Sequence, residues 1–245
     1  MKNDSLIPPL SVQTLAEFLR DLAYSETLFL SADWHLSVSP PSGDGKDTLY
    51  KGAICTHSRS KENTTHIYLS FAYAEATGIH DVKASVEGNI VRQENSMNFE
   101  AFRNYAMTLF GADKLYASKY TRERCMKRPV KNAPSLRELA DFMHSCSAAS
   151  GGTADWSLRV LHPRDNWDDV AYNGGLWTHQ PLCTPPSDKY HSISFSYSRT
   201  WGVYNVMAWS GKAKITDEKK MDFDRLKTLA QSLFSATTGF KETTT

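Results

Sequence analysis

The chain has 245 residues, a formal net charge of +1, 22% charged residues and 40% hydrophobic residues, as in ordinary globular proteins. The near-neutral charge argues against a DNA-binding surface that dominates the molecule, and equally against an acidic mimic of nucleic acid. No apolar run approaches the roughly 18 residues that a membrane span needs, and the start of the chain lacks the apolar segment of a signal peptide.

The first predicted element is a helix that begins after Ser11. Serine is a favoured N-cap residue, and apolar residues recur at helical spacing from Leu15 to Leu22. A strand follows, because apolar residues alternate with polar ones between Trp34 and Val38.

The next patterns predict three more strands and a closing helix. A short strand is expected at Tyr50–His57, and two longer strands at His66–Tyr73 and Val82–Val91. The dipeptide Thr77-Gly78 marks the bend between the two longer strands. An amphipathic helix is expected over Phe99–Phe110.

A basic segment, Lys114–Lys131, follows the closing helix. It contains seven lysine and arginine residues and one acidic residue, Glu123, and Asp113 directly precedes it. We interpret it as a solvated connector, with a docking site for an acidic partner as the alternative.

The second half of the chain repeats these patterns, so we interpret it as a tandem duplication. Leu15 aligns with Leu139 and Phe99 with Phe223, an offset of 124 positions, and in the middle Trp34 aligns with Trp156, an offset of 122. The matched blocks also include Tyr50-x-Gly52-x-Ile54-x-Thr56-His57 with Tyr172-x-Gly174-x-Leu176-x-Thr178-His179, and Ser70-Phe71-Ala72-Tyr73 with Ser194-Phe195-Ser196-Tyr197.

These patterns predict an α+β protein with two tandem duplicated domains. Each domain is expected to be an antiparallel sheet of about four strands, flanked by its N-terminal and C-terminal helices. The expected boundaries are 9–112 for the first repeat, 113–133 for the basic linker and 134–240 for the second repeat. We expect eight matched aromatic residues to be largely buried: Trp34, Trp156, Phe71, Phe195, Phe99, Phe223, Phe110 and Phe234.

The cysteines indicate neither a disulfide framework nor a metal site. None forms a Cys-x-x-Cys pair, and a duplicated site would have been copied with its ligands. We therefore expect reduced thiols, no metal and a cytoplasmic protein. The four residues are Cys55, Cys125, Cys146 and Cys183.

Catalytic motifs are absent from the sequence, and no cofactor-binding motif is present. The strongest catalytic hypothesis is a pair of duplicated histidines, His57 and His179, acting as acid and base. Two-histidine phosphoesterases, which are also built from duplicated α+β units, carry His-x-Ser or His-x-Thr twice. That motif fails here in both copies. We favour the interpretation that these threonines and histidines satisfy local backbone groups. Likewise, we expect Asp155 to cap or orient the start of its strand and Trp156 to anchor the core.

The two copies differ in a segment rich in tryptophan and aspartate, which suggests a partner-binding surface. Duplicates keep what the fold needs and diverge where a partner binds, and aromatic anchors are typical of protein interfaces. Such acidic residues would suit a basic cleft on a partner. The expected binding residues are Asp165, Trp167, Asp168, Asp169, Trp177 and Trp201.

The duplicated helix–sheet–helix layout, the chain length and the strand tryptophans in Ala-Asp-Trp-x-Leu resemble the immunity protein 52 family of bacteria. These proteins are paired with nuclease toxins of type VI and polymorphic secretion systems. The resemblance implies a protein that is not an enzyme. It would bind a cognate toxin in the cytoplasm, without contacting nucleic acid or membrane, and block the active cleft or lock the toxin's conformation.

The alternatives are a two-histidine hydrolase using His57 and His179, and a scaffold that binds an acidic partner through the basic segment.

Overall fold

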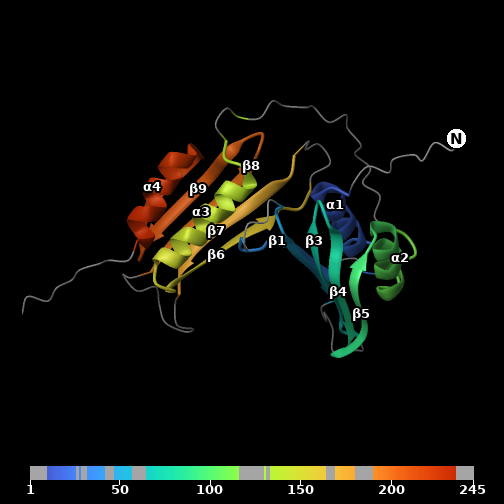
Figure 1. The fold of residues 1–245 in the computed structure, drawn as a ribbon. Coiled ribbons are helices and arrows are strands. Elements are labelled where there is room, and N and C mark those ends of the chain that lie inside the picture. The colour runs from blue at the N-terminus through green and yellow to red at the C-terminus, as the bar shows by residue number, and fades with distance from the viewer. Residues whose placement is uncertain are drawn as a thin grey trace, which may run out of the picture. The chain divides into compact units, whose positions relative to one another are not determined.

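The structure is a computed structural model that describes residues 10–25, 28, 32–41, 47–56, 65–115, 130, 133–163, 169–179 and 190–235. These residues form an α+β protein with four helices and ten strands (Figure 1). The chain divides into two compact units. Unit 1 comprises Met1–Met126 and Val160–Val170, and unit 2 comprises Lys127–Arg159 and Ala171–Thr245.

Unit 1 contains two helices and five strands. The strands pair in chain order, β1-β2-β3-β4-β5, and each pair is antiparallel. The elements are α1 (Val12–Ala23), β1 (Ala32–Val38), β2 (Tyr50–Thr56), β3 (Ile67–Ala74), β4 (Gly78–Val86), β5 (Asn89–Met97) and α2 (Phe99–Leu109).

Unit 2 repeats the same order of elements. Its strands follow one another as β6-β7-β8-β9-β10, and Figure 1 shows α3 and α4 together on one side of them. The elements are α3 (Leu136–Ala149), β6 (Ala154–Val160, whose last residue belongs to unit 1), β7 (Ala171–Thr178), β8 (His191–Ser198), β9 (Gly202–Ser210), β10 (Ala213–Met221) and α4 (Phe223–Phe234).

The number of strands corrects the expectation of about four in each copy. The segment expected as one strand, Val82–Val91, is two strands, because Glu87 and Gly88 turn the chain with φ values of 50° and 79°. Gly211, with φ 56°, makes the matching turn in the second copy. The expectation of one separate sheet in each copy is also not met, since the structure does not divide the ten strands into two sheets.

The helices begin where the sequence predicted. Ser11 caps α1 by accepting the N–H of Thr14, and Ser135 caps α3 in a capping box with Glu138. Asn98 and Asp222 occupy matched positions and cap α2 and α4 in the same way. Each side chain accepts one backbone N–H that the first turn leaves without a helical partner.

One face of the strands packs against the helices and forms the core of each unit. In unit 1 the ring of Phe18 on α1 meets Phe99 edge-on at 5.7 Å, and in unit 2 Phe142 on α3 meets Phe223 at 5.6 Å. Of the eight aromatic residues expected in the core, five are buried and none is exposed. Trp156, Phe99 and Phe223 are half-buried.

The repeated glycines are close approaches between neighbouring strands. Gly52 pairs with Phe71, and Gly174 pairs with Phe195. A Cβ atom on either glycine would lie closer than 3.0 Å to three ring carbons of the paired phenylalanine. The glycines therefore leave room for a buried aromatic ring.

A buried tyrosine ties the third strand of each copy to the start of its first helix. The hydroxyl of Tyr73 donates to the carbonyl of Leu10, and that of Tyr197 donates to the carbonyl of Pro134. Both bonds span 63 positions, so the duplication preserves the tether as well as the elements.

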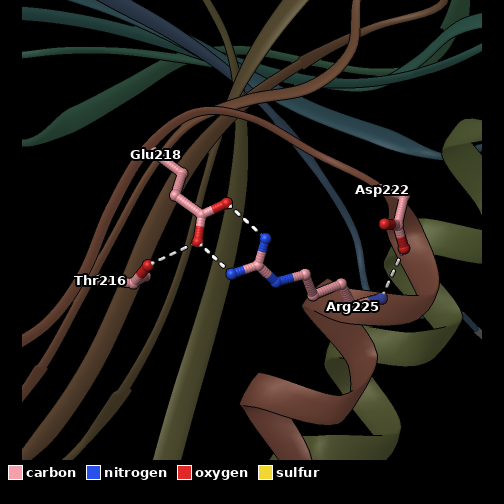
Figure 2. A network of polar contacts seen from close by, with 4 residues as sticks. All are labelled: Thr216, Glu218, Asp222 and Arg225. Atoms are coloured by element: carbon pink, nitrogen blue, oxygen red, sulfur yellow. Dashed lines mark hydrogen bonds and ion pairs between the residues drawn. The ribbon is translucent and has the colours of Figure 1, made fainter.

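In unit 2 an ion pair joins α4 to β10 (Figure 2). Arg225 on the helix donates to both carboxylate oxygens of Glu218, at 2.8 and 2.5 Å, while its backbone N–H donates to the cap residue Asp222. Glu94 is the matched residue in unit 1, and its partner at 3.2 Å is Arg92 on the same strand. Both copies thus neutralise a glutamate on the helix side of the strands, but with arginines from different elements.

Candidate partner-binding surface

The side chains that point away from α3 and α4 form the second face of the strands in unit 2. On β8 this face carries Ser192, Ser194 and Ser196, because Ile193, Phe195 and Tyr197 alternate with them and are buried. The residues paired with these serines on β7 and β9 therefore also lie on the second face.

The strand register places four large side chains there. Ser192 pairs with Trp177 on β7 and with Trp209 on β9. Two strand spacings separate these tryptophans, or about 10 Å. Ser194 pairs with Met207, and Ser196 pairs with Tyr204. We call the surface formed by Trp177, Tyr204, Met207 and Trp209 the aromatic face.

A β-bulge brings Tyr204 and Met207 to the same face although they are three positions apart. The register between β8 and β9 shifts between Ser194 and Ser196. Asn205 has a φ of 51° there, a conformation that asparagine tolerates better than most residues. Asp81 has the same φ at the matched position in unit 1, so the bulge belongs to the duplicated fold.

The aromatic face is partly accessible to solvent. Met207 is 39% exposed, and the other three side chains are half-buried. The ring of Trp177 lies back over Gly175, where a Cβ atom would be 3.3 Å from it. The ring therefore lies across the face instead of standing away from it, and it covers part of the backbone of β7.

Trp201, one of the residues expected to bind a partner, lies in the turn between β8 and β9. It is 43% exposed, and the ammonium nitrogen of Lys220 lies 5.6 Å from the centre of its ring. Lys220 pairs with Tyr204, so Trp201 borders the aromatic face. The structure does not bring Trp201 next to Trp177, because these residues lie at opposite ends of the β7–β8 pair.

The acidic residues of the expected site are only partly described. Asp165, Trp167 and Asp168 lie outside the described residues. Asp169 is half-buried just before β7 and belongs to unit 1, whereas Trp177 belongs to unit 2. The acidic part of the expected surface therefore stays a prediction.

The two copies differ sharply on this face. Trp177, Tyr204, Met207 and Trp209 stand where the first copy has Cys55, His80, Lys83 and Ser85. On the opposite face the matched residues are similar, as Phe71 and Phe195 or Tyr73 and Tyr197 illustrate. Divergence is thus concentrated on the side of the strands that the core does not require.

Sequence reasoning did not include Tyr204, Met207 and Trp209 among the expected binding residues. Their alternation is broken by the bulge at Asn205, so a regular strand pattern does not put Tyr204 and Met207 on one face. Comparing Val203–Ser210 with the matched segment of the first copy, position by position, would have shown the gain of apolar residues.

The expected histidine pair is only half described, because His57 lies outside the described residues. His179 follows β7, and its Nε2 lies 2.8 Å from a carboxylate oxygen of Asp155, with both side chains more than half exposed. An exposed pair of this kind contributes little to stability. The carboxylate could orient the imidazole for proton transfer, and the pairing of His179 with His57 stays a prediction.

The duplicated threonines have a structural role, as expected. Thr56 accepts the backbone N–H of Ile67 at 2.9 Å, and Thr178 accepts that of His191 at 2.9 Å. Each hydroxyl thus satisfies a backbone group at the start of the following strand.

Among the described cysteines, Cys55 and Cys146 are both free thiols. Burial raises the pKa of Cys146 to about 11, so this thiol is protonated at neutral pH. Cys125 and Cys183 lie outside the described residues, as does most of the basic segment Lys114–Lys131.

The described residues contain no group of three or more histidine, cysteine, aspartate or glutamate side chains arranged to hold a metal ion. Within the same part of the chain, no helix is long and apolar enough to cross a membrane. Comparisons of this chain with protein-family models, with curated proteins and with solved structures found no match.

Proposed function

We propose that this chain is an immunity protein that binds a cognate nuclease toxin and neutralises it. The observation that carries the proposal is the aromatic face of unit 2. A duplicated fold that retains its core in both copies, but carries partly solvent-accessible tryptophan, tyrosine and methionine side chains on the second face of one copy, is consistent with a binding protein. The family resemblance of the sequence supplies the class of partner.

The composition of the aromatic face suits a protein interface. Tryptophan, tyrosine and methionine are enriched in the cores of interfaces, and a few such residues commonly dominate the binding free energy. The three serines of β8 between them present small polar groups that can accept or donate hydrogen bonds. A partner that covers this face would bury the half-exposed rings of Trp177 and Trp209.

Binding of this chain to the toxin would be enough to inhibit it. An immunity protein bound beside the catalytic cleft excludes the nucleic acid by steric overlap, so this chain needs no catalytic group of its own. The side chains of Asp165, Asp168 and Asp169 would add negative charge for a basic cleft, if the loop that carries them joins the same interface.

Site-directed photo-crosslinking in the host organism tests the proposal. A photoreactive phenylalanine analogue is placed at Met207, and the control places it at Lys83, the exposed residue at the matched position of unit 1. We expect a specific protein adduct from position 207 that position 83 does not give. Mass spectrometry then identifies the adduct.

The captured protein is purified, and its cleavage of plasmid DNA and of RNA is measured with increasing amounts of this chain. We expect nuclease activity that falls to background at an equimolar ratio. A captured protein without nuclease activity, activity that this chain leaves unchanged, or equal adducts from both positions would each contradict the proposal.

A further inference from the structure

A series of lysines borders the aromatic face along β10 and the turn before it. They are Lys212, Lys214, Lys219 and Lys220, and all four are exposed. We call this series the lysine edge. From it we infer the chemistry of the surface that unit 2 binds. The inference rests on the proposed function, in that it takes the aromatic face as the binding site.

Three of the four lysines of the lysine edge have no ion-pair partner among the described residues. Lys214 forms an ion pair with Asp217 at 2.8 Å. In the part of the chain that the structure describes, Lys212, Lys219 and Lys220 form none. Glu218, the other acidic residue of β10, faces the helix side and is bound by Arg225 (Figure 2).

The lysine edge is absent from the first copy. At the matched positions, unit 1 has Gly88, Ile90, Asn95 and Ser96. The fold therefore does not require these lysines, because β5 forms the same strand without them. The lysines thus occur in the same copy as the aromatic side chains.

Contacts between rings and ammonium groups join the lysine edge to the aromatic face. The Nζ atom of Lys214 lies 5.7 Å from the ring centre of Trp209, and that of Lys220 lies 5.6 Å from the ring centre of Trp201. Such cation–π contacts hold a lysine beside an apolar surface without neutralising it. One partner covering this face would thus meet apolar rings and positive charge together.

We propose that the lysine edge and the aromatic face together bind an apolar protein surface rimmed by carboxylates. The rings would pack against the apolar centre of the partner, while its aspartate and glutamate side chains would pair with Lys212, Lys219 and Lys220. Rim charges of this kind act mainly on the rate and specificity of association. The lysine edge thus calls for a negatively charged partner surface, whereas the aspartates at positions 165–169 would suit a basic cleft.

One feature favours a protein over single-stranded nucleic acid, which also binds surfaces that combine lysines with aromatic rings. Met207, which pairs with Ser194 in the middle of the face, offers no planar ring on which a base could stack.

A random-peptide library displayed on phage, selected on the immobilised full-length chain, tests the proposal without requiring the natural partner. We expect the enriched peptides to combine aspartate or glutamate with aromatic or aliphatic residues. The affinity of the synthesised peptides is then measured with the K219N/K220S variant, which carries the residues of the first copy. We expect binding to weaken about tenfold, with a smaller dependence on salt concentration.

The matched control is K51N/K83S, which makes the same change of charge at exposed lysines of unit 1 and should change affinity less than twofold. Circular dichroism checks that both variants fold. Enriched peptides without an excess of acidic residues, or equal losses in both variants, would overturn the proposal. So would tighter, lysine-dependent binding of short oligo(dT). A captured partner that proves not to be a nuclease removes the proposed function but leaves the peptide result standing.

Discussion

At the scale of single residues, the two copies retain contacts that a small change would break. Gly174 and Phe195 make one such contact, and Gly52 and Phe71 make its counterpart. In each pair the ring occupies the space of the missing side chain, so the phenylalanine and the glycine depend on one another. Retention of both pairs explains why these glycines stand out in the sequence.

We expect Gly174→Ala to lower the free energy of unfolding by about 1–3 kcal/mol, because the new methyl group displaces the ring of Phe195 in a closely packed core. Chemical denaturation monitored by circular dichroism measures this. Gly175→Ala is the control, since the atom nearest to its Cβ would be a ring carbon of Trp177 at 3.3 Å, and it should cost less. Equal effects of the two substitutions would show that the Gly174–Phe195 contact is not special.

The buried tyrosine of unit 1 gives a prediction about pH. Burial, with smaller contributions from Glu75 and Tyr50, raises the pKa of Tyr73 above its ordinary value of 10.0. The unfolded chain therefore loses this proton first, and stability that is complete below pH 10 should fall as the pH rises above it. Urea denaturation between pH 8 and about pH 11 should show this fall, and Tyr73→Phe should reduce it while lowering stability at pH 8 by about 1 kcal/mol. A variant with an unchanged alkaline slope would contradict the assignment.

At the scale of elements, the last helix of each copy is fixed by its cap and by packing more than by ion pairs. The pair between Arg225 and Glu218 is well aligned, but the arginine side chain is 61% exposed. Water competes for such a pair, so its contribution to stability is small. The cap at Asp222 instead satisfies a backbone group at the start of α4.

We therefore expect Asp222→Ala to cost about 1 kcal/mol of unfolding free energy, more than Glu218→Gln. Asp222→Asn is the matched control and should be close to wild type, because Asn98 performs this role at the start of α2. Thermal and urea denaturation of the three variants would decide the order. A larger loss from Glu218→Gln would show that the ion pair dominates.

At the scale of the whole molecule, the two units share one order of elements but present different surfaces. The tryptophans and lysines of the second copy, and the acidic residues at positions 165–169, distinguish the second copy from the first. Binding experiments with variants that restore residues of the first copy can separate these contributions.

With the captured toxin, Trp209→Ser should mainly speed dissociation, because a buried aromatic anchor acts on residence time. The control Ser85→Trp places the same ring at the matched position of unit 1 and should leave the rates unchanged. Surface plasmon resonance measures both. Unchanged dissociation of the Trp209 variant would move the interface away from the aromatic face.

The acidic loop has a separate test. If Asp168 and Asp169 face a basic region of the toxin, replacing both with alanine should slow association and weaken its dependence on salt. Replacing Trp167 should mainly speed dissociation. If all these variants keep wild-type rates, the loop lies outside the interface, and the basic segment Lys114–Lys131 becomes the next candidate.

Much of this protein could be predicted from the sequence because the signals are local or repeated. Helix caps at Ser11 and Ser135, the bend at Thr77-Gly78 and the duplicated order of elements all follow from neighbouring residues and from the comparison of the two halves. The turns at Gly88 and Gly211 were missed because apolar residues continue on both sides of them, so each pair of strands looked like a single long one.

Tertiary structure alone decided which residues share a surface. The alternation of a regular strand would separate Tyr204 from Met207, and only the bulge at Asn205, set by pairing with β8, places both on the face that carries Trp177. Likewise, the sequence shows four lysines between positions 212 and 220, but only the pairing of β10 with β9 places Lys214 beside Trp209 and Lys220 beside Tyr204. Periodicity reports local backbone geometry, whereas a binding surface depends on how strands distant in sequence align.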